Sequence, residues 1–449
     1  MRSSAQKIRH IRILARRHGP TSLVWRRRFA TGIGAVLVGL VALLFARAAD
    51  EAMALFELAS GALPWLPVVV TPFGVFALAA ITKWWTPEAR GSGIPQVIAA
   101  ARNPGGPIEP LLSLKTGFAK LAMTLTALLV GASVGREGPT VQVSAAILAR
   151  VHRSFRVPVT AGVIIAGGAA GVAAAFNTPL AGVAFAIEEL ANAFEQRVTM
   201  LVMTAILISG MVSLGLAGDY VYFGALTETL PVSRMLIIAP VAGFIGGVAG
   251  GLFARLILSV TRHRRRYLGP LAARPLLWAL ICGAGIALIG MATGLTCGTG
   301  YAASKAIIEG ARAPWYFGPA KFAATTLSTL AGMPGGIFSP SIATGAGLGN
   351  MLCLLFPKDP RGAVVLLGMI AYFTGVVRAP LTAVIIVMEV TASRGMILPL
   401  FASAVIADAS AQLICKEKLY HGLAREFVAA VSAENRVDSK AGSGTLDPS

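Results

Sequence analysis

The feature that most limits what this chain can fold into is a glutamate in a short polar break between two apolar stretches. The break runs from Gly135 to Thr140 and reads GREGPT, with mostly apolar residues at 124–134 and 141–151. An ionisable side chain at membrane depth is costly and marks a functional site by default. Pro139 suits a first helical turn, because its missing N–H is one that a helix start leaves unpaired. We therefore expect the positive end of a helix to face the break, where an anion, or the Glu137 carboxylate acting as a gate, can lie.

The composition indicates an integral membrane protein. Of the 449 residues, 55% are hydrophobic and 13% are charged, and the mean hydropathy is +0.73, outside the range of soluble domains. The net charge of +19 does not indicate nucleic-acid binding, because Arg and Lys cluster beside apolar spans, at the N-terminus and at 262–266, as in cytoplasmic loops. The four cysteines are scattered singly and predict neither a disulfide framework nor a metal site, and we expect no cofactor.

Three regions follow from the order of charge and hydropathy. Residues 1–28 are basic without an acidic residue and precede the apolar run 29–45, so we expect a cytoplasmic N-terminal segment. A cleaved signal peptide with a site at 46–48 is disfavoured, because the basic part is too long and more spans follow. Residues 29–430 form the predicted membrane domain, and 431–449 a polar C-terminal tail. Further apolar spans are expected at 68–85, 111–134, 159–175, 198–216, 236–260, 275–293, 317–330, 363–374 and 398–414.

An internal repeat organises the membrane domain. Pro139 and Pro340 lie 201 residues apart, as do Pro179 and Pro380, and the same shift brings Glu188 to Glu389. The chain is therefore predicted to contain two homologous halves, at about 29–216 and 234–430. Transporters commonly arrange such halves with inverted topology, so that interrupted helices meet near the bilayer midplane. We expect an all-α fold of tilted and partial helices in which the helix starts at Pro95, Pro139 and Pro340 converge on one site.

Three glycine–proline motifs resemble the signature stretches of the CLC chloride channel and transporter family. They are GSGIP at 91–95, GREGP at 135–139 and GIFSP at 336–340, and Tyr420 resembles the late tyrosine of the family. The resemblance covers about residues 29–425. It implies the CLC fold and a homodimer in the lipid bilayer with one pore in each subunit.

The resemblance also implies the roles of individual residues. Chloride is held by the hydroxyls of Ser92 and Tyr420 and by the backbone N–H groups of Ile337 and Phe338. Glu137 matches the external gating glutamate, and Glu189 matches the internal glutamate of the proton-coupled members. The chain therefore resembles an antiporter of chloride and protons.

The source that this resemblance favours is bacterial, because the paired cytoplasmic regulatory domains of animal members are not found. We accordingly expect the inner (plasma) membrane, with both termini cytoplasmic. Gln96 stands where some bacterial relatives have an acidic residue, so the details of the inner vestibule do not follow from the resemblance.

Two other functions remain open from the sequence. A passive, voltage-independent anion channel shares nearly every feature and differs in whether protons move with the anion. A membrane-embedded enzyme that uses Glu137 with Arg136 is a less favoured alternative. The stretch 298–305 imitates the Tyr-x-x-x-Lys pair of soluble dehydrogenases, but it lacks the glycine-rich turn after an N-terminal strand.

Each predicted site residue also has a structural interpretation. Ser92 can cap a helix, and Tyr420 can anchor the chain at the membrane interface. Glu189 can form an ion pair with Arg197. For Glu188, a structural contact with nearby backbone or an arginine is favoured over proton transfer.

Overall fold

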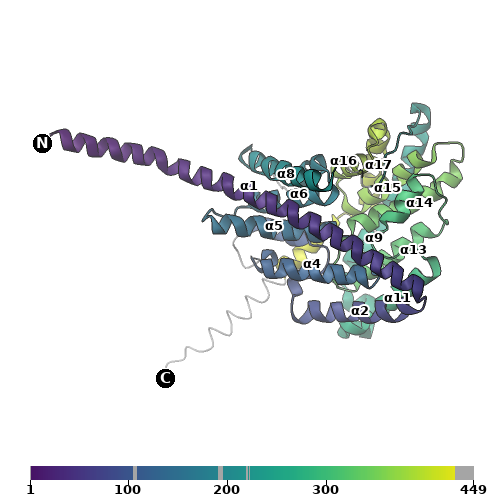
Figure 1. Cartoon of the computed structure of the whole chain (residues 1–449). Helices are drawn as coiled ribbons and strands as arrows, with labels where there is room; N and C mark the ends of the chain where they lie inside the picture. The colour runs from purple at the N-terminus through teal and green to yellow at the C-terminus, as the bar shows by residue number, and fades with distance from the viewer. Residues whose placement is uncertain (1, 105–108, 191–195, 219–220, 222, 430–449) are drawn as a thin grey trace, which may run out of the picture.

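The computed structural model describes residues 2–104, 109–190, 196–218, 221 and 223–429, with side chains from residue 22 onward apart from 109 and 196–199. The described part is all helical, without a named strand, and its helices differ widely in length and direction (Figure 1). The predicted tail at 431–449 lies outside the described residues.

The helices form two successive sets. The first set is α1 (Arg2–Ala62), α2 (Leu66–Trp84), α3 (Ile94–Arg102), α4 (Leu114–Leu129), α5 (Glu137–Ser154), α6 (Ala161–Phe176), α7 (Pro179–Phe185), the π-helical turn η3 (Ala186–Leu190) and α8 (Gln196–Ala217). The second set is α9 (Val232–Arg262), α10 (Arg264–Leu268), α11 (Pro275–Thr293), α12 (Tyr301–Ile308), α13 (Phe317–Leu330), α14 (Phe338–Leu355), α15 (Arg361–Val377), α16 (Pro380–Val390) and α17 (Ile397–Ile414). A further helical segment at 419–429 follows.

Two predicted span boundaries are wrong. The first apolar run was expected to end at residue 45, but α1 continues to Ala62 and crosses the body diagonally, without a break at 28/29 (Figure 1). Within this extension the Asp50 side chain is 58% exposed, and its carboxylate pairs with Arg136 at 2.7 Å. The span expected at 111–134 is the shorter helix α4, which begins after Ser113 because that hydroxyl accepts the N–H of Thr116.

The helices of the two sets correspond in order, as the repeat predicts. The pairs are α2 with α11, α3 with α12, α4 with α13, α5 with α14, α6 with α15, α7 with α16 and α8 with α17. Gly135 and Gly336, 201 residues apart, form an antiparallel bridge in which each N–H donates to the other carbonyl, at 2.7 and 2.8 Å. A pair of equivalent residues that exchange identical bonds is what inverted repeats produce about their pseudo-two-fold axis.

Glu188 and Glu389 show the same reciprocity. The Glu188 carboxylate accepts the N–H groups of Leu381 and Thr382 at 3.2 and 2.7 Å, at the start of α16. The Glu389 carboxylate accepts the N–H of Ala181 at 2.9 Å, at the start of α7. Each glutamate thus caps the helix of the other repeat, where N–H groups have no intrahelical acceptor. The structural interpretation of Glu188 is confirmed.

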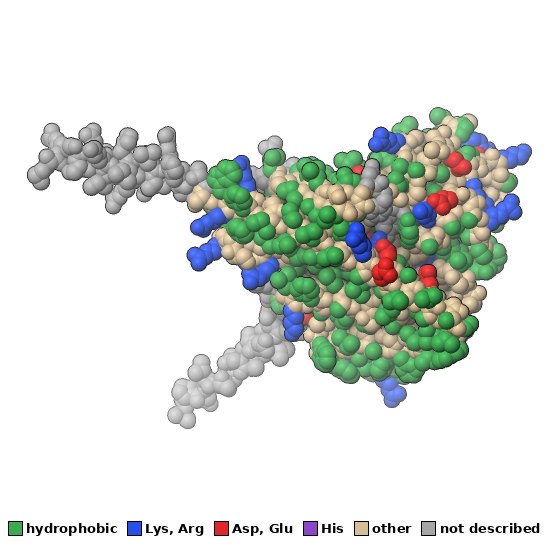
Figure 2. All heavy atoms as spheres, viewed as in Figure 1, with side chains coloured by type: hydrophobic (Ala, Val, Ile, Leu, Met, Phe, Trp, Pro, Cys, Tyr) green, Lys and Arg blue, Asp and Glu red, His purple; other side chains and the backbone are tan. Residues whose placement is uncertain are grey.

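The surface and helix lengths are those of a multi-pass membrane protein. Within the described residues, seven helices are long and apolar enough to cross a membrane, and α6, α15 and α16 are shorter apolar helices. Hydrophobic side chains cover much of the face in Figure 2, and Leu413, Leu58 and Leu354 are each more than 70% exposed. Exposed apolar area on this scale fits contact with lipid rather than water.

A glycine face brings α9 into close contact with α17. A methyl group on Gly243 would lie 2.7 Å from the Ser403 carbonyl oxygen, and one on Gly247 would lie 2.4 Å from that of Ala407. Gly251 faces Ala411 in the same way. The small-residue spacing in this span therefore allows backbone to approach backbone, as it does in tightly packed membrane helices.

The reciprocal caps predict matched losses of stability. Glu188→Ala and Glu389→Ala each leave helix-start N–H groups without an acceptor, which costs about 1–2 kcal/mol. Both variants should therefore melt at a lower temperature than the unmodified protein in detergent, whereas Glu51→Ala, at an exposed position of α1, should not. Equal melting temperatures for all three variants would contradict the capping role.

Candidate ion-binding site

Three helix starts meet at the centre of the molecule. The loops before α3 and α14 are joined by backbone hydrogen bonds from Gly91 N–H to Met333 O at 3.2 Å and from Gly335 N–H to Gly91 O at 3.1 Å. The loops before α5 and α14 are joined by the Gly135–Gly336 bridge. The positive ends of the three helices therefore face one region, as the sequence predicts, which favours a negative charge there.

Glycines are required where these loops touch. A methyl group on Gly138 would lie 2.6 Å from both the carbonyl oxygen and the hydroxyl oxygen of Ser92. Gly93 has a φ of 109°, and a methyl group there would lie 2.5 Å from the Gly138 carbonyl oxygen. Because side chains are excluded at both positions, backbone and the Ser92 hydroxyl line the meeting point.

The hydroxyl groups of Ser92 and Tyr420 lie close enough to interact with each other. Ser92 is 6% exposed and Tyr420 is fully buried, and neither hydroxyl oxygen has a hydrogen-bond partner among the described residues. Ser92 does not cap α3, whose N-cap is Gly93 without a side-chain bond, and a fully buried Tyr420 is no interfacial anchor. Buried polar groups are normally paired, so these hydroxyls are free to hold a ligand.

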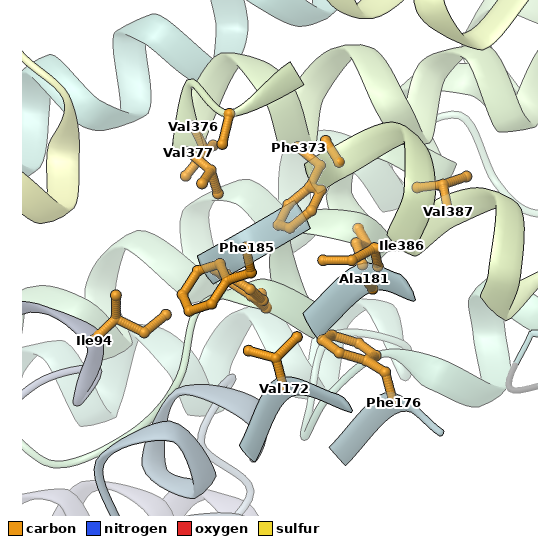
Figure 3. Packing of buried hydrophobic residues seen from close by; sticks show 14 of the residues in the cluster. Ile94, Val172, Phe176, Ala181, Phe185, Phe373, Val376, Val377, Ile386 and Val387 are labelled. Atoms are coloured by element: carbon orange, nitrogen blue, oxygen red, sulfur yellow. The ribbon is translucent and has the colours of Figure 1, made fainter. Parts of the chain in front are cut away.

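Ile337 and Phe338 form the start of α14, where backbone N–H groups have no acceptor inside the helix. The Phe338 ring contacts four other rings with centroid distances of 5.0–6.3 Å, those of Phe176, Phe185, Phe373 and Tyr420. Figure 3 shows three of these residues, Phe176, Phe185 and Phe373, packed in the apolar core. The helix start is therefore held in place by packing, and its own N-cap residue, Ile337, makes no side-chain capping bond.

The Glu137 carboxylate is bound at this same helix start. Glu137 is fully buried, and it accepts hydrogen bonds from the Ser339 N–H at 3.4 Å and from the Ser339 hydroxyl. Gly135 is needed here too, because a methyl group on it would lie 2.5 Å from Glu137 Oε2. Sequence reasoning placed Ser339 in a motif but did not predict it as the partner of Glu137.

Arg136 is directed toward α1 and not into the site. Its guanidinium donates to the Ala46 carbonyl and to the Asp50 carboxylate, both at 2.7 Å. It therefore ties the motif to the first helix. In the part of the chain that the structure describes, no group of three His, Cys, Asp or Glu side chains could hold a metal ion.

Glu189 is buried on η3 and contacts the segment that carries Tyr420. Lys418 Nζ lies 3.7 Å from Glu189 Oε2, and His421 Nδ1 lies 3.2 Å from Oε1. The Glu189 side chain is 0% exposed, while those of Lys418 and His421 are 34% and 22% exposed. The side chain of Arg197, the expected partner, lies outside the described residues. Neither observed partner was predicted.

Two buried lysines, 201 residues apart, hold the loops before α3 and α12. Lys120 Nζ donates to the carbonyls of Ala89 and Gly91, the former at 2.7 Å. Lys321 Nζ donates to those of Thr296 and Gly298, at 2.8 and 2.7 Å.

A lysine inside a predicted apolar span is a signal that could have identified both residues. The same symmetry explains the dehydrogenase-like stretch at 298–305. It is the second-half equivalent of the GSGIP loop and its helix α3, not a nucleotide site.

A cavity of about 230 Å³ opens onto the convergence point. Its lining includes Ser92 and Ile337 together with the charged residues Arg90, Arg264 and Glu426. The two guanidinium groups make this a suitable approach for an anion. A larger cavity of about 840 Å³, beside Asp50 and Glu57, is lined by none of the predicted site residues.

Comparison with known proteins identifies the family. The sequence profile of the voltage gated chloride channel family matches residues 73–412, which is more than half of the chain. The chain therefore belongs to this family, the CLC proteins. As a member it is a multi-pass membrane transport protein and not an enzyme.

Solved structures share the fold. A slow cyanobacterial Cl⁻/H⁺ antiporter matches with a TM-score of 0.79 at 23% identity, over 90% of this chain and 98% of that one. A CLC-type fluoride/proton antiporter matches with a TM-score of 0.75 at 23% identity, over 88% and 96%. A eukaryotic CLC transporter matches with a TM-score of 0.72 at 23% identity, over 89% and 74%.

Lys120 and Lys321 provide a matched test of whether Lys120 positions the loop that carries Ser92. Lys120→Met removes the ammonium donor from the Ala89 and Gly91 carbonyls beside Ser92, so chloride affinity should fall about tenfold, the equivalent of one charged hydrogen bond. Lys321→Met removes the same kind of bonds from the equivalent loop and should leave affinity unchanged. Titration calorimetry of chloride into both variants in detergent measures this. Equal affinities would contradict the positioning role of Lys120.

Proposed function

We propose that this protein exchanges chloride for protons across a membrane. The observation that carries the proposal is the convergence of a set of hydrogen-bond donors beside two buried carboxylates, Glu137 and Glu189. The donors are the Ser92 and Tyr420 hydroxyls and the N–H groups that begin α14. Tyr420 lies within electrostatic reach of both Glu137 and Glu189. One site can thus be linked to two groups that carry protons.

Chloride binds, in this proposal, where Ser92, Tyr420, Ile337 and Phe338 converge. Backbone N–H groups and hydroxyls suit a halide, because they provide partial positive charge without a fixed cation that would hold the ion too tightly to leave. The basic cavity beside Arg90 and Arg264 is the route of approach.

Glu137 is the external gate. When ionised, its carboxylate takes the helix-start donors of Ser339, and it competes there with an anion for the same positive region. When protonated, it loses the negative charge that holds it there. Each opening of the gate therefore requires a proton, and this requirement couples the two fluxes.

Glu189 is the internal proton acceptor. Its burial keeps it out of contact with water, and its position near Tyr420 leaves a proton path separate from the basic cavity. We further propose a homodimer with one pore in each subunit, located in a bacterial inner membrane. The basic run at 262–266 and the basic N-terminus support a cytoplasmic position for both termini.

Replacing either Glu137 or Glu189 should affect proton movement and chloride movement differently. In vesicles, a chloride gradient should drive protons the opposite way through the unmodified protein. Glu137→Gln and Glu189→Gln should both abolish proton movement and preserve chloride movement, because an amide cannot carry a proton. Chloride and pH electrodes in one chamber measure both fluxes.

Glu188→Gln is the matched control, since its amide oxygen can still accept the α16 N–H groups. It should pump protons normally. Chloride movement without protons in the unmodified protein would instead establish a passive channel.

Ser92 should contribute to the choice of anion. In the family that the chain resembles, a hydroxyl here accompanies chloride preference and proline accompanies nitrate preference. Ser92→Pro removes the hydroxyl donor and should shift coupled transport toward nitrate, measured as the ratio of proton fluxes driven by nitrate and by chloride gradients. An unchanged ratio would show that the hydroxyl does not select.

A further inference from the structure

The buried Glu189 carboxylate has a partly exposed histidine as its neighbour. His421 Nδ1 lies 3.2 Å from Glu189 Oε1, and its side chain is 22% exposed whereas that of Glu189 is 0% exposed. The contact is an ion pair when the ring is protonated, and the two atoms lie within hydrogen-bond distance of each other. His421 therefore touches both solvent and a carboxylate that solvent does not reach.

The charged groups around this pair are a lysine and two further carboxylates. Lys418 Nζ lies 3.7 Å from Glu189 Oε2, and Glu188 is close enough to act on Glu189 electrostatically. Glu417, in the loop before His421, interacts electrostatically with the His421 ring. The Arg262 guanidinium binds the Glu417 carboxyl and lowers its pKa, which keeps Glu417 ionised. A positive charge on His421 is thus balanced by carboxylates on two sides.

His421 differs from Lys418 in what it can do with a proton. An imidazole both accepts and donates protons near neutral pH, whereas an ammonium group holds its proton. A ring also has two nitrogens, so one can face solvent while the other faces Glu189. Lys418 can favour the ionised carboxylate, but it cannot pass protons through repeated cycles at neutral pH.

We propose that His421 passes protons between the cytoplasm and Glu189, a role that rests on the proposed exchange function. A hydronium ion on the cytoplasmic side donates a proton to Nε2 of the neutral ring and is left as water. The Nδ1–H bond then breaks as an O–H bond forms on Glu189, and the electron pair stays on the nitrogen. One proton enters and one leaves, so the ring returns to neutrality as the other tautomer. Tyr420, next in sequence, places this relay beside a proposed chloride ligand.

The test compares proton and chloride fluxes in two backgrounds. In the otherwise unmodified protein, His421→Asn should lower proton flux about tenfold, the scale of a positioned acid–base group, and should preserve chloride flux, as Glu189→Gln does. In the Glu137→Gln background, where chloride moves without protons, the same change should leave chloride flux unaltered. His263→Asn, at an exposed position between α9 and α10, is the control and should change neither flux.

A second variant separates proton transfer from packing. His421→Ala should regain proton flux when imidazole is added on the side that the residue faces, because a free ring can carry the proton. Unchanged proton flux in both His421 variants would overturn the relay. A loss of chloride flux in the Glu137→Gln background, without imidazole rescue, would show that His421 only positions Tyr420. If the unmodified protein moves chloride but no protons, the exchange function itself fails.

Discussion

The antiparallel pairing of Gly135 with Gly336 is the contact on which the rest of the site depends. It joins two interrupted helices through backbone alone, and equivalent residues of the two repeats make identical bonds. No side chain can enter, because a methyl group on Gly336 would lie 2.9 Å from the Gly135 carbonyl oxygen. The starts of α5 and α14 are thereby held face to face inside an apolar core.

Helix starts brought together in this way carry an electrostatic cost that something negative must offset. Their N–H groups lack intrahelical acceptors, and an unpaired donor in an apolar interior is unfavourable. The N–H groups at the starts of α7, α16 and α14 find acceptors in two different ways. Carboxylates satisfy α7 and α16 permanently, through Glu389 and Glu188. At α14 the carboxylate is Glu137, which neighbours unpartnered hydroxyls. In the proposed function, a replaceable anion at one helix start, among the caps that Glu188 and Glu389 provide elsewhere, is the physical basis for ion exchange.

The helix starts and the two-fold repeat could be predicted from the sequence, because their motifs occur twice along the chain. Glycines and prolines located the helix starts, and the 201-residue shift related Glu188 to Glu389 before their caps were seen. Contacts made by single side chains across long distances could not be predicted. Nothing local relates His421 or Lys418 to Glu189, since 229 residues separate Lys418 from that carboxylate. The continuation of α1 beyond residue 45 was missed because charged residues, among them Asp50, follow that position, and Arg136, the partner of Asp50, lies 86 residues further along the chain.

The position of the bound anion tests the account most directly. In crystals grown with bromide, anomalous scattering should place an ion between the Ser92 and Tyr420 hydroxyls and the N–H groups of Ile337 and Phe338. In Glu137→Gln crystals a second ion should appear beside Ser339, where the carboxylate otherwise lies. Bromide bound elsewhere, or the same single ion in both crystals, would contradict the claim that an anion and Glu137 compete for one set of helix starts.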